Sequence, residues 1–127
     1  MGSVALDANV IIGLIDSRDA HHERAVFELS AVATREDDLI MASSAYAEAI
    51  VQPLRAEQGE LVDGFVDASR IAIIPIDREL AREAAALRAR HGSLRLGDAL
   101  VLAVARERDA VLLTFDARLR RISKASA

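Results

Sequence analysis

Residues 98–116 read DALVLAVARERDAVLLTFD, and this stretch contains the pattern that predicts the fold. The seven residues after Asp98 are all apolar, which is typical of a helix buried on every side. The apolar run at 110–115 follows at once and predicts a buried strand that ends just before Asp116. Ionised aspartate is rarely buried without a partner. The two carboxylates that bracket this segment therefore need an explanation.

The same alternation runs through the rest of the chain. Strands are predicted at 4–6, 38–42, 70–76 and 110–115, and helices from about residue 9, over 19–37, 43–59, 60–69 and 77–92, and from 98 and 116. Strands separated by helices predict a parallel sheet with helices on both faces. We expect a single domain over 1–127, a three-layer α/β/α sandwich with a central sheet of four or five strands.

Several details of these elements can also be predicted. Ser43 or Ser44 is expected to cap the helix over 43–59, and Pro53 is expected to kink or end it. The strand at 70–76 is too apolar for an exposed edge of the sheet. His21 and His22 stand at a charged helix start and are predicted to lie at the surface.

Composition limits the possible functions. The 127 residues include no cysteine, which excludes disulfides and thiolate zinc sites. No apolar run is long enough to span a membrane and no signal peptide is evident, so we expect a cytoplasmic protein without a membrane partner. Residues 1–77 carry 14 acidic and 5 basic side chains, whereas 78–127 carry 6 acidic and 11 basic ones, nearly all arginine. Arginine suits phosphate contacts.

Four acidic residues, far apart in the sequence, are directed to one edge of the predicted sheet. Asp7 ends the first strand, Asp116 follows the last, Glu48 lies one turn into the helix after the second strand, and Asp98 opens the helix before the last strand. Right-handed crossovers bring all these positions to the carboxyl edge. If the first strand lies between the second and the fourth, Asp7 and Asp116 flank the point where the strand order reverses, the usual ligand site.

Two interpretations of these acids remain open. Each aspartate could simply cap a helix or lie in its first turn. Alternatively, the carboxylates face one another, and their repulsion is relieved by a hard divalent cation such as Mg²⁺ or Mn²⁺. Such an ion lowers the pKa of bound water and neutralises charge on a phosphodiester. The chemistry that follows is metal-assisted hydrolysis of a phosphate ester.

Four short motifs give the chain a resemblance to a known family. They are LDANVII at 6–12, SSAYAEAIVQPLRA at 43–56, LRLGDALVLAVA at 94–105 and LLTFDARL at 112–119. In order and spacing they resemble the PIN domain, specifically the toxins of VapBC toxin–antitoxin pairs. Gly97 stands where many members of the family have proline.

The resemblance implies a set of roles and partners. It maps the catalytic quartet onto Asp7, Glu48, Asp98 and Asp116, with Asp7, Asp98 and Asp116 as ligands of Mg²⁺ or Mn²⁺. Asn9 and Thr114 would orient the site. The implied activity is that of an endoribonuclease toxin, usually a homodimer, silenced by a cognate antitoxin. The candidates for contact with the RNA backbone are Arg95, Arg118, Arg120 and Arg121.

Other functions are compatible with an acidic edge. A receiver domain would need a lysine near the end of a late strand, and the only lysine is Lys124. A phosphoaspartyl phosphatase would usually have aspartate two residues after its nucleophile, where this chain has Asn9. A third alternative is a PIN-like module that binds RNA or protein without catalysis.

Overall fold

The structure, a computed structural model, describes residues 2–125. Its elements are β1 (Ser3–Leu6), α1 (Ala8–Ile15), α2 (His22–Thr34), β2 (Asp38–Ala42), α3 (Ser43–Arg55), α4 (Gly59–Ala68), β3 (Ala72–Ile74), α5 (Arg78–Arg90), α6 (Leu96–Glu107), β4 (Val111–Leu113) and α7 (Ala117–Ala125). The strands form one sheet in the order β3-β2-β1-β4, and every pairing is parallel. The predicted α/β fold is confirmed, with four strands in the described part of the chain.

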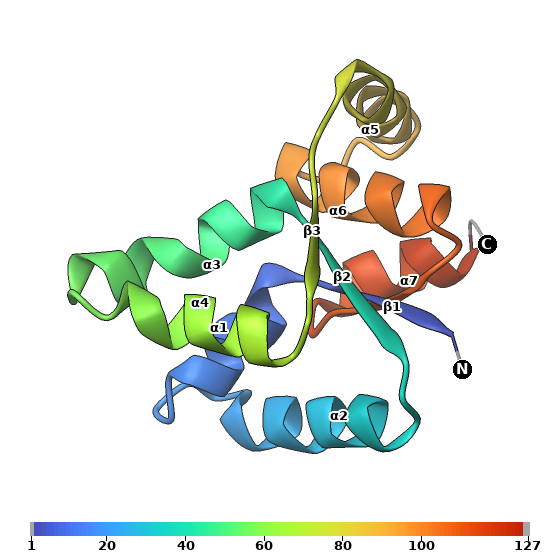
Figure 1. Cartoon of the computed structure of the whole chain (residues 1–127). Coiled ribbons are helices and arrows are strands. Elements are labelled where there is room, and N and C mark those ends of the chain that lie inside the picture. Colours follow the sequence, from blue (N-terminus) through green and yellow to red (C-terminus); the bar gives the residue numbers. More distant parts are fainter. Residues whose placement is uncertain (1, 126–127) are drawn as a thin grey trace.

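Helices cover both faces of the sheet, as Figure 1 shows. α1, α2 and α4 lie on one side, and α5 and α6 lie on the other. α6 packs against β1, β2 and β4, and Val101 to Ala105 are all buried within it. The segment that predicted the fold is therefore the central helix of one layer. No helix in residues 2–125 combines the length and hydropathy needed to cross a membrane.

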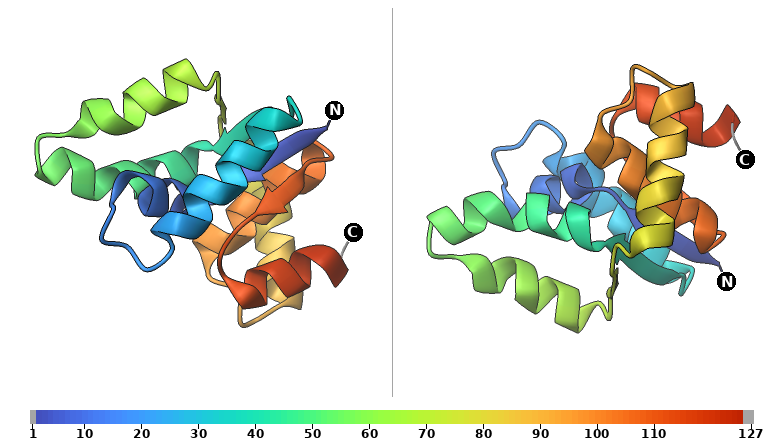
Figure 2. Two further views of the ribbon diagram at one scale, coloured as in Figure 1. Left: turned by 90° about the horizontal axis from the view of Figure 1, so that it is seen from below. Right: turned by 90° about the horizontal axis from the view of Figure 1, so that it is seen from above.

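α3 and α4 form a hairpin that extends away from the sheet (Figure 2). The N-cap of α3 is Ala42, which makes no side-chain hydrogen bond, and Ser43 and Ser44 both lie inside the first turn. The predicted serine cap is therefore wrong, because the helix starts directly from the last residue of β2. Pro53, which was expected to kink or end this helix, lies within the last turn of α3, and the helix ends at Arg55.

The strand predicted at 70–76 is an edge strand, contrary to expectation. β3 covers only Ala72–Ile74 and pairs with β2 alone. Ile74 is buried and Ile73, on the opposite face, is half-buried, whereas Ala72 is exposed. The apolar composition therefore reflects coverage of the faces, not a central place in the sheet.

Candidate active site

Hydrogen-bonded polar side chains gather at the carboxyl edge of the sheet, at the point where the strand order reverses. β1 lies between β2 and β4: the chain runs from β1 through β2 to β3 and then crosses back to place β4 on the other side of β1. Asp7 directly follows β1 and caps α1, accepting a hydrogen bond from the Ala8 N–H at 2.8 Å. Its own N–H donates to the Leu113 carbonyl of β4 at 3.0 Å. The backbone of both strands thus fixes the position of this carboxylate.

Asp7 is an unusual aspartate because it is only 8% exposed. Burial raises the pKa of its carboxyl above the usual value, although hydrogen bonds from Thr114 and Ala8 act in the opposite direction. The negative charges of Asp98 and Glu48 raise that pKa further. Three of the four predicted acids are therefore close enough to interact electrostatically.

Thr114 connects the strand ends through a chain of hydrogen bonds. Its hydroxyl donates to Asp7 Oδ2 at 2.7 Å and accepts from Asn9 Nδ2 at 3.3 Å and from the Asp116 N–H at 3.1 Å. The Asn9 side-chain oxygen accepts from the Phe115 N–H at 3.2 Å. A hydroxyl has one donor and two acceptor sites, and all three are used here. Both residues predicted to support the site therefore hold the orientation of Asp7.

Asp98 and Glu48 approach this edge from two different helices. Asp98 lies in the first turn of α6, which begins two residues earlier than predicted. Its side chain is 17% exposed and accepts from the Arg95 N–H at 3.4 Å. Glu48 is an exposed residue of α3, and a Cβ atom placed on Gly97 would lie 3.6 Å from its Oε1 atom. The Glu48 carboxylate therefore lies beside the first turn of α6.

Asp116 is half-buried, and its side chain acts as a helix cap. Its Oδ1 atom accepts from the Leu119 N–H at 2.9 Å, at the start of α7. The backbone N–H of Asp116 donates to the Thr114 hydroxyl, which in turn donates to Asp7. The capping interpretation thus describes part of what each aspartate does. Capping alone does not require the deep burial of Asp7.

The residues present fit a hydrated divalent cation. Within residues 2–125, no group of three histidine, aspartate or glutamate side chains is arranged to bind a metal ion without further ligands. Mg²⁺, however, keeps several waters and takes only one or two carboxylates directly. The donor set consists of oxygens, which such an ion prefers. In addition, the Ser44 Oγ atom is shielded from solvent, has no hydrogen-bond partner within the described residues, and lies one helical turn before Glu48.

The four arginines predicted to contact RNA do not lie together. Arg95 is exposed, and its Nε atom lies 3.5 Å from the Asp98 carboxylate. Arg118 is exposed and donates to the Ser93 carbonyl at 2.9 Å, in the segment that leads into α6. Arg120 lines a hollow at the amino end of β4 with Val111 and Lys124, and Arg121 is exposed. Arg95 and Arg118 are therefore the pair associated with the start of α6.

The sequence did not point to one group of residues next to this edge. His21 is exposed as predicted, but it packs with Arg24 against the ring of Phe115. His22 was wrongly predicted to lie at the surface, since it is half-buried and its Nδ1 atom lies 2.8 Å from the Gly13 carbonyl. No spacing rule links residues so far apart, so only the fold reveals this cluster.

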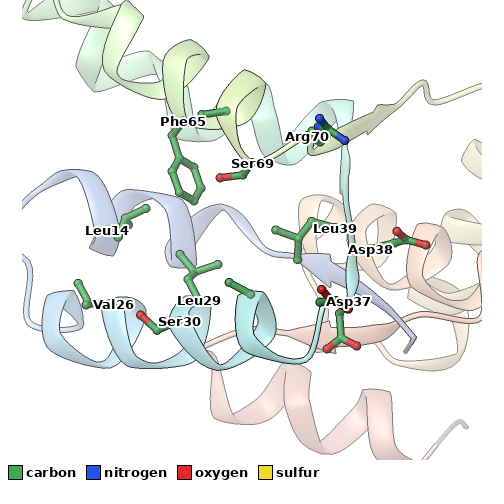
Figure 3. Close-up of a pocket in the computed structure, with 13 residues that line it drawn as sticks. Leu14, Val26, Leu29, Ser30, Asp37, Asp38, Leu39, Phe65, Ser69 and Arg70 are labelled. Atoms are coloured by element: carbon green, nitrogen blue, oxygen red, sulfur yellow. The ribbon is translucent and has the colours of Figure 1, made fainter.

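A separate groove of about 670 Å³ lies between α2 and α4 (Figure 3). Phe65 and Leu29 point into it from the two helices, and Leu14 closes one side. Asp37 and Arg70 lie at the other end. The lining includes none of the four acids, so this groove is distinct from the polar site.

Comparisons with known proteins agree with this fold. A family model described as PIN domain matches residues 4–125. The structure of Mycobacterium tuberculosis VapC20, a toxin that cleaves the sarcin-ricin loop, is similar with a TM-score of 0.76 and 15% identity over 94% of each chain. A toxin–antitoxin complex from Klebsiella pneumoniae gives a TM-score of 0.74 and 24% identity over 91% of this chain and 88% of that one.

VapBC2 from Rickettsia felis, bound to a DNA fragment from its promoter, gives a TM-score of 0.72 and 19% identity over 94% of this chain and 92% of that one. No curated protein matches the sequence. At these identities the likeness to solved structures establishes the fold, and the structural neighbours include VapC toxins.

Proposed function

This chain belongs to the PIN domain family, and from that membership we propose that it is a Mg²⁺- or Mn²⁺-dependent endoribonuclease, the toxin of a type II toxin–antitoxin pair. The observation that carries this proposal is the buried Asp7, whose pKa is raised by its burial and by the nearby charges of Asp98 and Glu48. A carboxylate kept in that position is unfavourable unless a cation binds beside it. RNA supplies the phosphodiester that such a site would hydrolyse.

The side chains divide the work of the reaction. Asp7, Asp98 and Asp116 would hold the ion, and Glu48 would orient the attacking water. When bound, Mg²⁺ or Mn²⁺ lowers the pKa of water and neutralises charge that develops on the phosphate. The Thr114 hydroxyl donates a hydrogen bond to Asp7, and the Asn9 amide donates one to Thr114. Both residues therefore keep the Asp7 carboxylate in one orientation.

A cognate antitoxin is the partner that fits the groove between α2 and α4. The groove offers an apolar lining from Leu29 and Phe65 with a charged end at Asp37 and Arg70, which suits an amphipathic segment with apolar anchors. Two of the similar solved structures are toxin–antitoxin complexes. The homodimer implied by the resemblance and the cytoplasmic location expected from the sequence remain predictions.

One alternative is disfavoured by the position of its key residue. A receiver domain would need a lysine beside its acidic pocket. Lys124 instead lies in α7 and lines the hollow at the amino end of β4. Incubation with a small phosphodonor should therefore yield no stable aspartyl phosphate.

The proposal is tested by incubating the purified protein with total RNA, with Mg²⁺ and then with a chelator, and mapping the new RNA ends. We expect discrete cleavage that needs the ion and that Asp7→Ala or Asp98→Asn abolishes without a change in circular dichroism. The matched control is Asp77→Asn, because Asp77 caps α5 through the Leu80 N–H at 2.9 Å and belongs to no part of the site. RNA that stays intact with Mg²⁺ would reject the proposal in favour of a binding module, and cleavage that persists in chelator would reject the metal dependence. Full activity in Asp98→Asn would remove Asp98 from the mechanism.

A further inference from the structure

Two basic side chains at the start of α2 pack against the loop that follows β4. The Cζ atom of Arg24 lies 4.7 Å from the centroid of the Phe115 ring. The ring centroid of His21 lies 5.0 Å from the same centroid, with the two planes inclined by 32°. The Phe115 N–H donates to Asn9 Oδ1 at 3.2 Å. Arg24 and His21 therefore contact Phe115, a residue of the hydrogen-bonded group that orients the acidic site.

The polar atoms of this pair are available for a ligand. Ion pairs within residues 2–125 involve Arg18, Arg35 and Arg95, and none involves Arg24. Neither the Arg24 guanidinium nor the His21 ring has a hydrogen-bond partner in that part of the chain, and both residues are exposed. A guanidinium presents five N–H donors in a planar fork, so Arg24 could bind a phosphate through two of them.

The segment that contains Arg24 and His21 is mostly acidic, so a basic side chain at this position suggests a contact with an anionic ligand. Arg24 is one of only 5 basic residues in 1–77, a segment with 14 acidic ones. A nucleic acid that approaches Asp7 meets several carboxylates, and its phosphates are repelled unless cations bind them on either side. Proteins that hold single-stranded nucleic acid combine basic side chains along the backbone with rings on which bases stack, and the exposed ring here is that of His21 because Phe115 is buried.

We propose that Arg24, held above Phe115 beside His21, binds a backbone phosphate of the RNA strand that runs past the acidic site. This inference rests on the proposed function. The fork of Arg24 faces the phosphate, and the exposed imidazole of His21 offers a flat surface for an adjacent base. Arg24 is thus a substrate-binding residue from the N-terminal half, whereas Arg95 approaches the site from the opposite helix layer.

The simplest competing role for Arg24 is to cover the Phe115 ring. Methionine separates the two roles, because its side chain can cover an aromatic ring but carries no charge. The matched control is Arg18→Met. Arg18 lies in the connection that leads from α1 into α2, but its Nε atom is paired with Asp16 at 3.3 Å.

The experiment measures fluorescence anisotropy of a short labelled single-stranded RNA with Mg²⁺, in an Asp98→Asn background that prevents cleavage. Arg24→Met should weaken binding about tenfold and reduce the slope of log affinity against log salt by about 0.7. Arg18→Met should change neither quantity, and both variants should keep the melting temperature of the background protein.

Two other results would overturn the inference. Affinity and salt slope unchanged in Arg24→Met would show that the side chain only covers Phe115, and wild-type cleavage of RNA would then leave the proposed function intact. If the wild type neither cleaves RNA nor binds the labelled strand, the proposed function and the phosphate contact are rejected together.

Discussion

Among the individual side chains, Asp7 shows how function and stability conflict. Its burial raises the pKa of the carboxyl in the folded protein above the unfolded value of 3.8. The folded state therefore holds its proton more tightly, and stability is lost as pH rises from about the unfolded pKa through the raised one. At pH values above the raised pKa, the buried ionised carboxylate destabilises the metal-free protein by a constant amount.

Asp7→Asn should remove this pH-dependent cost. Asparagine is as good a helix cap as aspartate, so in chelator the variant should gain stability relative to the wild type as pH rises from 4 to 7. Urea unfolding at several pH values measures the difference. Mn²⁺ at about 100 times its Kd should stabilise the wild type by about 2.7 kcal/mol and the variant far less. A stability difference between the two proteins that stays constant from pH 4 to 7 in chelator would contradict this account.

Ser44 offers a second test at the same site. A buried hydroxyl without a partner costs about 1–3 kcal/mol, and Ser44 Oγ is such an atom in the described chain. Ser44→Ala should therefore raise the metal-free free energy of unfolding by about 1 kcal/mol. If this hydroxyl binds water at the site, the substitution should also weaken Mn²⁺ binding about tenfold in calorimetry. Ser43→Ala is the control, and equal effects of the two substitutions would remove Ser44 from the site.

Among the helices, four share an unusual ending. α2, α3, α4 and α6 each close with a residue at positive φ that is not glycine, namely Glu36, Glu57, Arg70 and Asp109. After α3, the Gln58 N–H donates to the Pro53 carbonyl at 2.7 Å and the Glu57 N–H donates to the Leu54 carbonyl at 3.1 Å. This is the Schellman pattern, in which glycine is the favoured residue.

Replacement of Glu57 by glycine should relieve strain at the tip of the α3–α4 hairpin. The left-handed conformation costs a residue with Cβ about 1–2 kcal/mol, partly offset by the flexibility of glycine in the unfolded chain. Glu57→Gly should therefore raise the urea midpoint by an amount equivalent to about 0.5–1 kcal/mol. Glu57→Ala, which keeps the Cβ atom, should not raise it. Equal midpoints for both variants would show that the turn is unstrained.

The sequence predicted the elements well because each depends on local rules. The helix–strand alternation predicts a parallel sheet, and strand ends predict that Asp7 and Asp116 reach the same edge. The edge position of β3 could not be predicted, because helices that cover both faces make an edge strand as apolar as a central one. The contact of Arg24 with Phe115 also escaped prediction, since it joins residues that only the completed fold brings together.

For the protein as a unit, the acidic site and the groove between α2 and α4 are separate surfaces, so their functions should separate on mutation. Phe65 lines the groove and is half-buried. Phe65→Glu should leave RNA cleavage intact and abolish inhibition by the cognate antitoxin. Phe27→Glu is the control, because Phe27 is 71% exposed on α2 and does not line the groove. Normal inhibition of Phe65→Glu would place the antitoxin elsewhere.

The claim on which the rest depends is that Asp7 and its neighbouring carboxylates hold a divalent cation. Diffraction at the manganese absorption edge from crystals grown with Mn²⁺ tests it without reference to activity. We expect an anomalous difference peak about 2.1 Å from an Asp7 carboxylate oxygen. Saturating Mn²⁺ that gives no peak there, or a peak only at other surfaces, would contradict the claim.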